Sequence, residues 1–541
     1  MKLLSLKKRT VLTIIFLSFI NLFAFSTNYY ISATGNDSNN GTASGTPKLT
    51  LANIFSTYNL GSGDIINVAA GTYTETGITV GTDDEGFTIK GAALSGGAPT
   101  SIFDASSTAR WLFLNNINND NIILSRLTIK DHKNTDGGTP GGGGGIKIIA
   151  GCTGFTINYC VFDNCDTRTA SLQHRGGAIY SAEALIITYT TFKNCDAEYY
   201  GGAISIELSP AANSTISQCK FSSNNASNYG TAIFYGVSVS KSLTMTNCLL
   251  YKNGNTSGEA AIVAMNSSST LNIMNCTITA NGNTSVGTGG VLALSSSLIN
   301  ITNSIIYNNS GNTYNDVYNN SSTITMKNCC YGSSSEINSI TSNTGSIIAN
   351  PLFTSSATDD YSLSNSSTCI DGGTLTGAPT NDIRNYSRVN NPDIGAYESN
   401  GVVLPIELLN FNGEKKADSN FIFWSTASEC DNDYFILEKS IDGITWDVLD
   451  RFKGQGNSHR IVNYNFTDYN INAEVSYYKL IQVDLNGKMK KYSPISLKSN
   501  FANQNFIFRN QLGQEIDYEN SPTGVYLKCF MDGTSIKVFK D

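Results

Sequence analysis

One short polar segment, residues 129–137, contains three side chains that could transfer protons. Asp131 and His132 are adjacent, and Asp136 follows four residues after His132. Carboxylates and imidazoles are common general acids and bases in enzymes, so these three side chains are the candidates for catalysis. A structural role is the competing interpretation for His132, and we favour it because His132 falls at a turn position of an internal repeat.

Two tetrapeptides in this segment resemble motifs of polysaccharide-degrading enzymes. Residues 134–137 (Asn-Thr-Asp-Gly) resemble a tetrapeptide of the polygalacturonases, and residues 129–132 (Ile-Lys-Asp-His) resemble a pectate-lyase motif. The first resemblance implies a paired Asp segment, a Gly-His-Gly and an Arg-x-Lys. No Gly-His-Gly occurs, and the later pair Asp359 and Asp360 is too far along the chain to meet Asp136, so we interpret this tetrapeptide as a coincidence.

The pectate-lyase resemblance implies a calcium ion that acidifies the substrate. Calcium takes six to eight oxygen ligands, and Asp163 and Asp196 have no evident companions to complete such a set. Residues 83–85 (Asp-Asp-Glu) and 36–37 (Asn-Asp) could bind calcium weakly, although solvated turns are the simpler interpretation. The sequence therefore predicts no catalytic residue, no metal site and no cofactor, with calcium as the one ion to consider.

These candidate residues are part of a chain that repeats one pattern. Each unit contains short runs of β-branched or aromatic residues that alternate with small polar residues, which is typical of strands. A fixed period between 20 and 50 residues indicates stacked units, and short strands stacked at about 4.8 Å form a parallel β-helix. The large apolar residues, 30, 29, 29, 28 and 28 positions apart, are Phe162, Phe192, Phe221, Leu250, Ile278 and Ile306.

The repeat predicts two more ladders beside this apolar one. The first contains Cys160, Thr190, Cys219, Cys248, Cys276 and Ser304. The second lies at a turn, where stacked amides can bond along the axis, and contains Cys165, Cys195, Asn224, Asn253, Asn281 and Asn309. The glycine pairs after this turn are expected to supply positive φ or close approach between coils.

Twelve cysteines would ordinarily indicate disulfides in an exported protein. Most of them fall at equivalent repeat positions, so packing as small buried hydrophobes is our interpretation. Cysteines on adjacent coils are close to bridging distance, which leaves oxidation open. Zinc is disfavoured because the chain lacks the Cys-x-x-Cys spacing of structural sites, and Cys329 and Cys330 are adjacent.

Several segments resemble secreted bacterial β-helix proteins. Residues 221–224 (Phe-Ser-Ser-Asn) and 176–179 (Gly-Gly-Ala-Ile) are similar to the repeats of bacterial β-helix surface proteins, including chlamydial polymorphic outer-membrane proteins. Residues 29–54 resemble the opening of such proteins, which implies a first strand and a short amphipathic helix that cap the core. Residues 369–398 resemble their closing segment. Its acids and arginines are interpreted as end-cap hydrogen-bonding groups, not as a catalytic cluster.

The composition predicts four segments. Residues 1–26 are a signal peptide, with Lys2, Lys7, Lys8 and Arg9 before an apolar run, and no later segment is long and apolar enough to span a bilayer. Residues 27–400 are the right-handed parallel β-helix with its cap. Charged residues then become denser, with 33 in residues 405–541 against 45 in the preceding 404, so a new domain begins near residue 401.

Residues 401–500 alternate as about seven short strands, which predicts a β-sandwich of fibronectin or immunoglobulin type. They resemble the module that precedes sorting signals in secreted proteins of Bacteroidetes. Residues 501–541 resemble the end of a type IX secretion sorting domain, which implies the type IX machinery as a partner and a secreted or outer-membrane-attached, cell-surface location. The usual opening Tyr-Pro-Asn-Pro is absent from this tail.

The function expected from these features is non-catalytic, adhesion-type binding of a polysaccharide or another cell-surface ligand. A net charge of −8 without a basic stripe disfavours nucleic acid. The alternatives are a polysaccharide lyase or glycoside hydrolase that acts in a groove of the solenoid, and a passive surface spacer. Because the repeated residues form the scaffold, binding is expected in what does not repeat: the loop 134–145, the outward strand positions and the turn 167–175, where His174 and Arg175 are exposed candidates for ligand contact.

Overall fold

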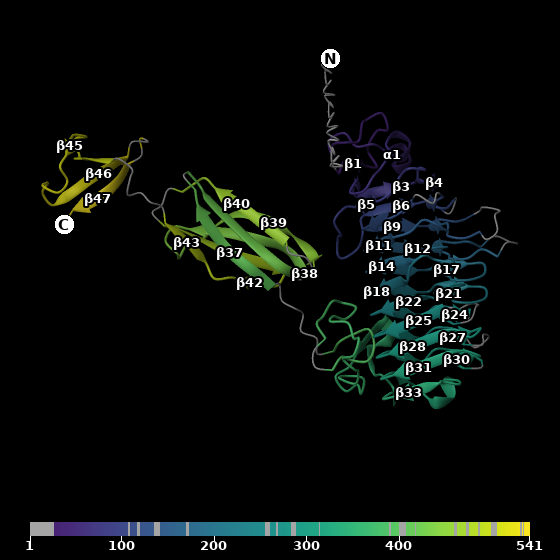
Figure 1. Ribbon diagram of the computed structural model, residues 1–541. Coiled ribbons are helices and arrows are strands. Elements are labelled where there is room, and N and C mark those ends of the chain that lie inside the picture. The colour runs from purple at the N-terminus through teal and green to yellow at the C-terminus, as the bar shows by residue number, and fades with distance from the viewer. Residues whose placement is uncertain are drawn as a thin grey trace, which may run out of the picture. The chain divides into compact units, whose positions relative to one another are not determined.

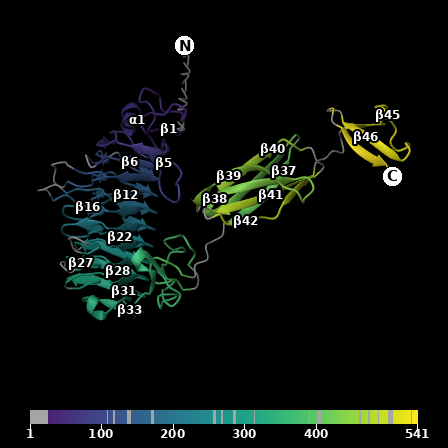
Figure 2. The same cartoon turned by 180° about the vertical axis from the view of Figure 1, so that it is seen from behind.

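The computed structural model describes residues 26–540 of the chain, apart from short gaps (Figures 1 and 2). The gaps are residues 107–108, 116–118, 135–140, 169–172, 255–259, 267–268, 283–287, 313, 389–390, 400–406, 417, 459–461, 472–474, 485–486, 499–505, 531–532 and 534. The predicted signal peptide, except for Ser26, lies outside the described residues. The chain divides near residue 401 into two compact units, which we describe separately.

The first unit is a parallel β-helix whose coils contribute one strand to each of three sheets, and its all-β architecture confirms the predicted fold class. Sheet A contains β1 (Asn28–Ile31), β2 (Ile65–Val68), β5 (Thr88–Gly91), β8 (Ile123–Ser125), β11 (Phe155–Asn158), β14 (Leu185–Thr188), β18 (Ser214–Ser217), β22 (Lys241–Thr246), β25 (Ser269–Met274), β28 (Leu298–Thr302), β31 (Thr323–Lys327) and β33 (Ser342–Thr344). Sheet B contains β3 (Gly71–Tyr73), β6 (Ser101–Asp104), β9 (Leu127–Lys130), β12 (Val161–Asp163), β15 (Thr191–Lys193), β19 (Lys220–Ser222), β23 (Leu249–Tyr251), β26 (Thr277–Thr279), β29 (Ile305–Tyr307), β32 (Cys330–Tyr331) and β34 (Ile347–Ile348). Sheet C contains β4 (Ile78–Thr79), β7 (Leu112–Leu114), β10 (Ile146–Ile148), β13 (Ile179–Ser181), β17 (Ile204–Leu208), β21 (Ile233–Val237), β24 (Ile262–Met265), β27 (Val291–Leu294) and β30 (Val317–Asn320).

Short elements complete the first unit. They are α1 (Leu51–Thr57), β16 (Asp196–Ala197) paired with β20 (Asn225–Ala226), η1 (Ser334–Glu336), η2 (Ser356–Thr358), and β35 (Phe353–Ser355) paired with β36 (Asp360–Leu363). Helix α1 begins after Thr50, whose side chain accepts a hydrogen bond from the Asn53 amide. Leu51 and Ile54 are fully buried against the core, so the predicted capping helix is confirmed.

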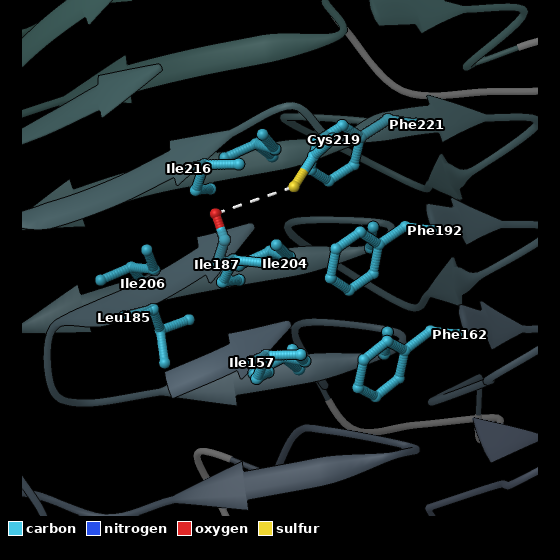
Figure 3. Close-up of a cluster of buried hydrophobic side chains, with 14 of the residues drawn as sticks. Ile157, Phe162, Leu185, Ile187, Phe192, Ile204, Ile206, Ile216, Cys219 and Phe221 are labelled. Carbon is cyan, nitrogen blue, oxygen red and sulfur yellow. Dashed lines mark hydrogen bonds between the residues drawn. The ribbon is translucent and has the colours of Figure 1, made fainter. Parts of the chain in front are cut away.

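The predicted apolar ladder is confirmed in register. Phe162 pairs with Phe192 and Phe192 with Phe221 on neighbouring strands of sheet B, and all three are fully buried. Figure 3 shows these rings in one column. Their centroids are 5.0 and 4.9 Å apart, and the ring planes differ by 7° and 5°. The spacing follows from the separation between strands, so identical aromatic residues stack without a change of rotamer.

The small-residue ladder is also confirmed, and its hydrogen bonds explain which residues share it. Cys219 Sγ donates to the carbonyl of Ser217 at 3.1 Å, two residues earlier in the chain. Thr190 Oγ1 and Ser304 Oγ donate in the same way, at 2.9 and 2.8 Å. A thiol and a hydroxyl therefore fill this position interchangeably, because both are small donors that satisfy the same carbonyl.

The turn ladder is confirmed as a continuous series of side-chain amides. Asn224 donates from Nδ2 to Asn253 Oδ1 at 2.9 Å, Asn253 to Asn281 at 2.8 Å, and Asn281 to Asn309 at 2.9 Å. Each Nδ2 also donates at 3.0 Å to a carbonyl of sheet B one coil earlier. These buried amides therefore satisfy one another along the axis of the helix.

The glycine pairs behave as predicted. Gly176 has a φ of +66°, in the left-handed region. A Cβ on the next residue, Gly177, would lie 2.1 Å from the carbonyl oxygen of Gly202. The first glycine therefore allows the turn, and the second allows two coils to approach each other.

Residues 351–399, which we call the strap, lie along the side of the later coils, beside them in Figure 1. This placement differs from the end cap predicted for the closing segment. A column of asparagines in the turn between sheets A and B, each with φ near +50°, holds the strap. The donors to strap carbonyls are Asn247 (2.7 Å), Asn275 (3.1 Å), Asn303 (2.8 Å) and Asn328 (3.1 Å).

The strap also covers part of the outer face of sheet B. Leu249 packs with strap residues in one buried cluster, and Ile305 and Cys330 pack with Cys369 and Ile394 in another. Earlier coils carry Asp163 and Lys193 on this face, which form an ion pair at 3.0 Å. The outer face of sheet B therefore changes from charged to apolar where the strap begins.

The second unit contains two antiparallel arrangements. The β-sandwich contains β37 (Glu407–Lys415), β38 (Asn420–Ser440), β39 (Asp447–Ser458), β40 (Val462–Asp468), β41 (Val475–Asp484), β42 (Met489–Lys491) and β43 (Ile495–Lys498). Strand β38 pairs with β37 and β40 through its first half and with β39 and β41 through its second half, around buried Trp424. The tail is a separate sheet of β44 (Phe506–Arg509), β45 (Glu515–Ile516), β46 (Gly524–Phe530) and β47 (Ser535–Lys540).

Candidate functional site

The connections between sheets B and C are the least regular part of the coil. The connection from Cys165 to Gly176 spans residues 166–175, whereas the equivalent connection from Cys195 to Gly201 spans residues 196–200. Insertions into a solenoid map to one face, which is often the binding face. A binding site is therefore expected where these connections meet the outer face of sheet C.

A buried polar cluster lies at that place. Arg175 ends the long connection and forms an ion pair with Glu207, which lies on β17. Ser205, two residues before Glu207 and on the same face of β17, donates from Oγ to Glu207 Oε1 at 2.5 Å. Glu207 is 5% exposed, so its charge is held by Arg175 and Ser205 and not by water.

Aromatic rings surround the guanidinium of Arg175. Its central carbon lies 5.1 Å from the ring centroid of Tyr200 and 5.9 Å from that of Tyr199. The Tyr199 and Tyr200 centroids are 4.1 Å apart, and Tyr200 stacks on Phe234 of β21 at 4.2 Å with ring planes 11° apart. Tyr199, Tyr200 and Tyr229 are half-buried, so the cluster presents ring surface beside a partly exposed cation.

Burial shifts the titration of two members of the cluster. It raises the pKa of Glu207, although the positive charge of Arg175 opposes the shift. Burial, together with the charge of Glu207, raises the pKa of Tyr180 on β13 to about 12. The Tyr180 hydroxyl is buried and has no hydrogen-bond partner among the residues that the structure describes. The cluster therefore combines half-buried ring faces with a partly exposed guanidinium, which are groups that can bind a sugar.

The imidazole weighed as a catalytic candidate lies in the interior of the coil. His132 is fully buried, with Nδ1 3.1 Å from the Ala109 carbonyl oxygen and Nε2 3.2 Å from the Phe103 carbonyl oxygen. Burial lowers the pKa of His132 to about 4. Its neighbour Lys133 pairs with Asp166, which confirms the predicted register of His132 with Cys165.

The acids weighed as calcium ligands have other partners. Asp131 pairs with Lys130 at 2.9 Å and accepts a hydrogen bond from Asn164 at 2.5 Å. Burial alone would raise the pKa of Asp131, but the hydrogen bonds from Asn164 and Lys130 outweigh it and lower that pKa. Asp163 pairs with Lys193, and Asp196 pairs with Arg168 at 2.9 Å.

The acidic turns near the N-terminus have structural partners. Asp84 accepts hydrogen bonds from the amides of Leu60 (2.7 Å) and Gly81 (2.9 Å). Asp37 accepts from the amides of Leu49 and Thr50, both at 2.9 Å, just before α1. Within the described residues, no group of three or more His, Cys, Asp or Glu side chains is placed to hold a metal ion.

The remaining predicted candidates are dispersed. Asp136 lies outside the described residues. Asn134 is buried, and its backbone amide donates to the Asp166 carbonyl at 2.8 Å. Asp359 pairs with Lys252 at 2.5 Å on the strap side of the coil. The prediction that His174 is exposed is wrong, because it is fully buried and its Nδ1 lies 3.2 Å from the Thr167 carbonyl oxygen.

The charged residues of the strap form the hydrogen-bonded network expected of them. Asp382 accepts from the Arg384 side chain at 2.9 and 3.0 Å and from the Glu398 amide at 3.0 Å. Arg388 pairs with Glu398 at 2.9 Å, and both side chains are at most 3% exposed. These charges therefore stabilise the strap.

Sequence reasoning found Arg175 but missed Tyr180, Ser205 and Glu207. Their signal is the strand alternation after each glycine pair: Ile179 and Ile204 point into the core, so the residue that follows each of them points outward. The structure brings these residues together because Tyr180 and Ser205 pair across β13 and β17.

A family model described as "Right handed beta helix region" matches residues 76–286, which include every residue of this cluster. The match and the parallel coils of the first unit together show that this chain contains a right-handed β-helix. No curated protein matches the chain. Within the described residues, no helix is long and apolar enough to cross a membrane.

Proposed function

We propose that this chain is a secreted, surface-attached β-helix protein that binds a glycan without converting it. The binding site is the cluster of Arg175, Tyr199 and Tyr200 on the outer face of sheet C. The observation that carries the proposal is the half-buried tyrosine pair packed on a guanidinium, where an irregular connection meets the sheet. Aromatic rings bind the apolar faces of sugar rings, and the partly exposed guanidinium of Arg175 can donate hydrogen bonds to their hydroxyls.

Binding of the purified full-length chain to a panel of acidic and neutral polysaccharides tests this function. Tyr199→Ala should weaken binding by at least about tenfold, in line with the loss of one stacked ring. The matched control is Tyr159→Ala, because Tyr159 is also half-buried and stacks on Tyr189 at 4.7 Å, but in the turn between sheets A and B. Equal losses in the two variants, or a panel without binding, would contradict the proposal. A panel without binding would favour the alternative function, a passive surface spacer.

A polysaccharide lyase or glycoside hydrolase is the second candidate function, and Glu207 is the observation that favours it. A carboxyl group whose pKa is raised by burial is a suitable general acid. Turnover of a polysaccharide that is lost in Glu207→Gln but kept in Glu207→Asp would establish the enzyme. Binding without turnover, with or without calcium, supports the non-catalytic function.

The proposed cell-surface location is supported by the N-terminal apolar run and by the C-terminal tail sheet. The apolar run behind Lys7, Lys8 and Arg9 supports export, and the tail sheet β44–β47 supports recognition by type IX secretion machinery of a Bacteroidetes host. Deletion of residues 522–541 should leave the protein in the periplasm of its host. Unchanged surface display of the shortened chain would contradict the sorting role, whatever the result of the glycan assay.

A further inference from the structure

The strap is tethered to the last coils at a pair of cysteines. Cys330 lies on β32, directly after Cys329, whose side chain faces the core of the coil. Cys330 faces outward and packs with Ile305, and the strap residues Cys369 and Ile394 complete the same buried cluster. The two thiols lie in this one buried cluster, and each affects the titration of the other. We propose that Cys330 and Cys369 form a disulfide that clamps the strap to the β-helix.

Geometry separates this pair from the other buried cysteines. Cys248 and Cys276 are stacked on adjacent coils, and the Cys248 amide donates to Cys276 Sγ at 3.4 Å. Their Cα–Cβ bonds are side by side at the spacing of parallel strands, about 4.8 Å, whereas a disulfide needs Cβ atoms about 3.8 Å apart. Cys330 and Cys369 come from two packed elements, the coil and the strap, and share one buried cluster, so the strand spacing does not fix their separation.

The chemistry requires an oxidant, which is a low-molecular-weight disulfide or a thiol oxidase of an oxidising compartment. The two thiols lose two protons and two electrons, one S–S bond forms, and the oxidant disulfide is reduced to two thiols. Both sulfurs are fully buried when the strap is docked, so oxidation takes place as the strap folds onto the coil. Once formed, the bond is shielded from reductants by the same cluster.

The full-length chain exported to a bacterial periplasm provides the test. Free thiols are alkylated in denaturant, and the chain is digested and mapped by mass spectrometry without reduction. We expect one cross-linked peptide pair through Cys330 and Cys369, with Cys248 and Cys276 alkylated. Alkylation of both Cys330 and Cys369, or a bond from Cys330 to any other cysteine, would overturn the proposal.

Cysteine variants test which residues form the disulfide and whether it holds the strap. Cys369→Ser should abolish the cross-link and leave Cys330 alkylated, whereas Cys329→Ser and Cys276→Ser should keep it. Proteolysis of the folded chain should cut the strap at least roughly tenfold faster in Cys369→Ser, because the closed loop from residue 330 to residue 369 no longer restricts its release. Equal cleavage rates in the variant and in the oxidised chain would show that the bond does not clamp the strap.

Discussion

Asn309 donates from Nδ2 to Oδ1 of Asp316 at 2.8 Å, so the ladder of buried amides ends on a buried carboxyl group. The other oxygen of Asp316 is buried without a donor among the described residues, and the same holds for Oε2 of Glu336, which lies against it. Two facing acceptors are compatible when a proton lies between them. Burial and the charge of Glu336 raise the pKa of Asp316 to about 8, although hydrogen bonds from Asn309 oppose the shift.

This carboxyl group should make the stability of the β-helix fall as pH rises. The unfolded chain releases the Asp316 proton near pH 4, whereas the folded chain holds it to about pH 8. The contribution is therefore fully present below pH 4 and is lost between pH 4 and pH 8, at up to about 1.4 kcal/mol per pH unit. Asp316→Asn continues the ladder without a titrating group, so urea unfolding at pH 5 and pH 8 should show a smaller difference in the variant.

The matched control for this change is Asp371→Asn, at an exposed aspartate of the strap. Both substitutions replace one carboxyl group with an amide, but only Asp316 is buried beside a second acid. The control should keep the pH dependence of the natural chain. If Asp316→Asn lowers stability at pH 8, the shared-proton interpretation is wrong.

At the other end of the same ladder, His132 should make the stability of the β-helix fall at acid pH. Burial lowers the pKa of His132 to about 4, although its contacts with the Ala109 and Phe103 carbonyls oppose the shift. An unfolded histidine titrates near pH 6.5, so this contribution to stability is present above pH 6.5 and is lost as pH falls to about 4. His132→Asn can still donate to the Phe103 carbonyl, as Asn224 donates to that of Phe192. Thermal unfolding at pH 7 and pH 4.5 should differ less in this variant than in the natural chain.

The apolar ladder can be tested at Phe192, whose ring stacks between those of Phe162 and Phe221. Phe192→Ala should lower the free energy of unfolding by ~3–5 kcal/mol, because it leaves a cavity between two fixed rings. Phe192→Leu is the control, since Leu250 fills the equivalent position of a later coil, and it should cost less than half as much. Urea unfolding measures both, and a loss below about 1 kcal/mol in Phe192→Ala would contradict the stacked ladder.

The coil could be predicted from the sequence because its register is carried by large residues at a fixed spacing. Phe162, Phe192 and Phe221 pair as their positions predict. The turn ladder followed in the same way, since amides one period apart must stack when the strands do. The end of this ladder at Asp316 could not be predicted from the repeat. Asp316 is seven residues from Asn309 in the sequence, whereas the other partners in the ladder are one period apart.

The strap and the candidate site were harder to predict because their contacts do not follow the period. Asn247 binds a strap carbonyl 134 residues away, and the sequence does not specify that pairing. One local signal existed: outward positions of sheet B change from Lys220 to Leu249, which indicates that something covers the later coils. The cluster at Glu207 needs Arg175 from another coil. The irregular length of the connection that ends at Arg175 places this side chain beside Glu207.

The charged core of the strap gives the sharpest test of how the strap is held. Arg388 is buried between strap and coil: it pairs with Glu398, and it donates to Asn247 Oδ1 at 2.9 Å and to the Gly395 carbonyl at 3.0 Å. Arg388→Ala would leave Glu398 buried without its cation, which typically costs 3–5 kcal/mol. The strap should therefore detach before the coils unfold, and limited proteolysis should cut within residues 351–399 while residues 26–350 stay intact. Lys252→Ala is the matched control, because Lys252 pairs the coil with Asp359 of the strap, and both side chains are exposed enough (42% and 36%) for water to replace the pair. Loss of the whole β-helix together with the strap in Arg388→Ala would contradict an independently held strap, and equal cleavage in the two variants would contradict the role of the buried pair.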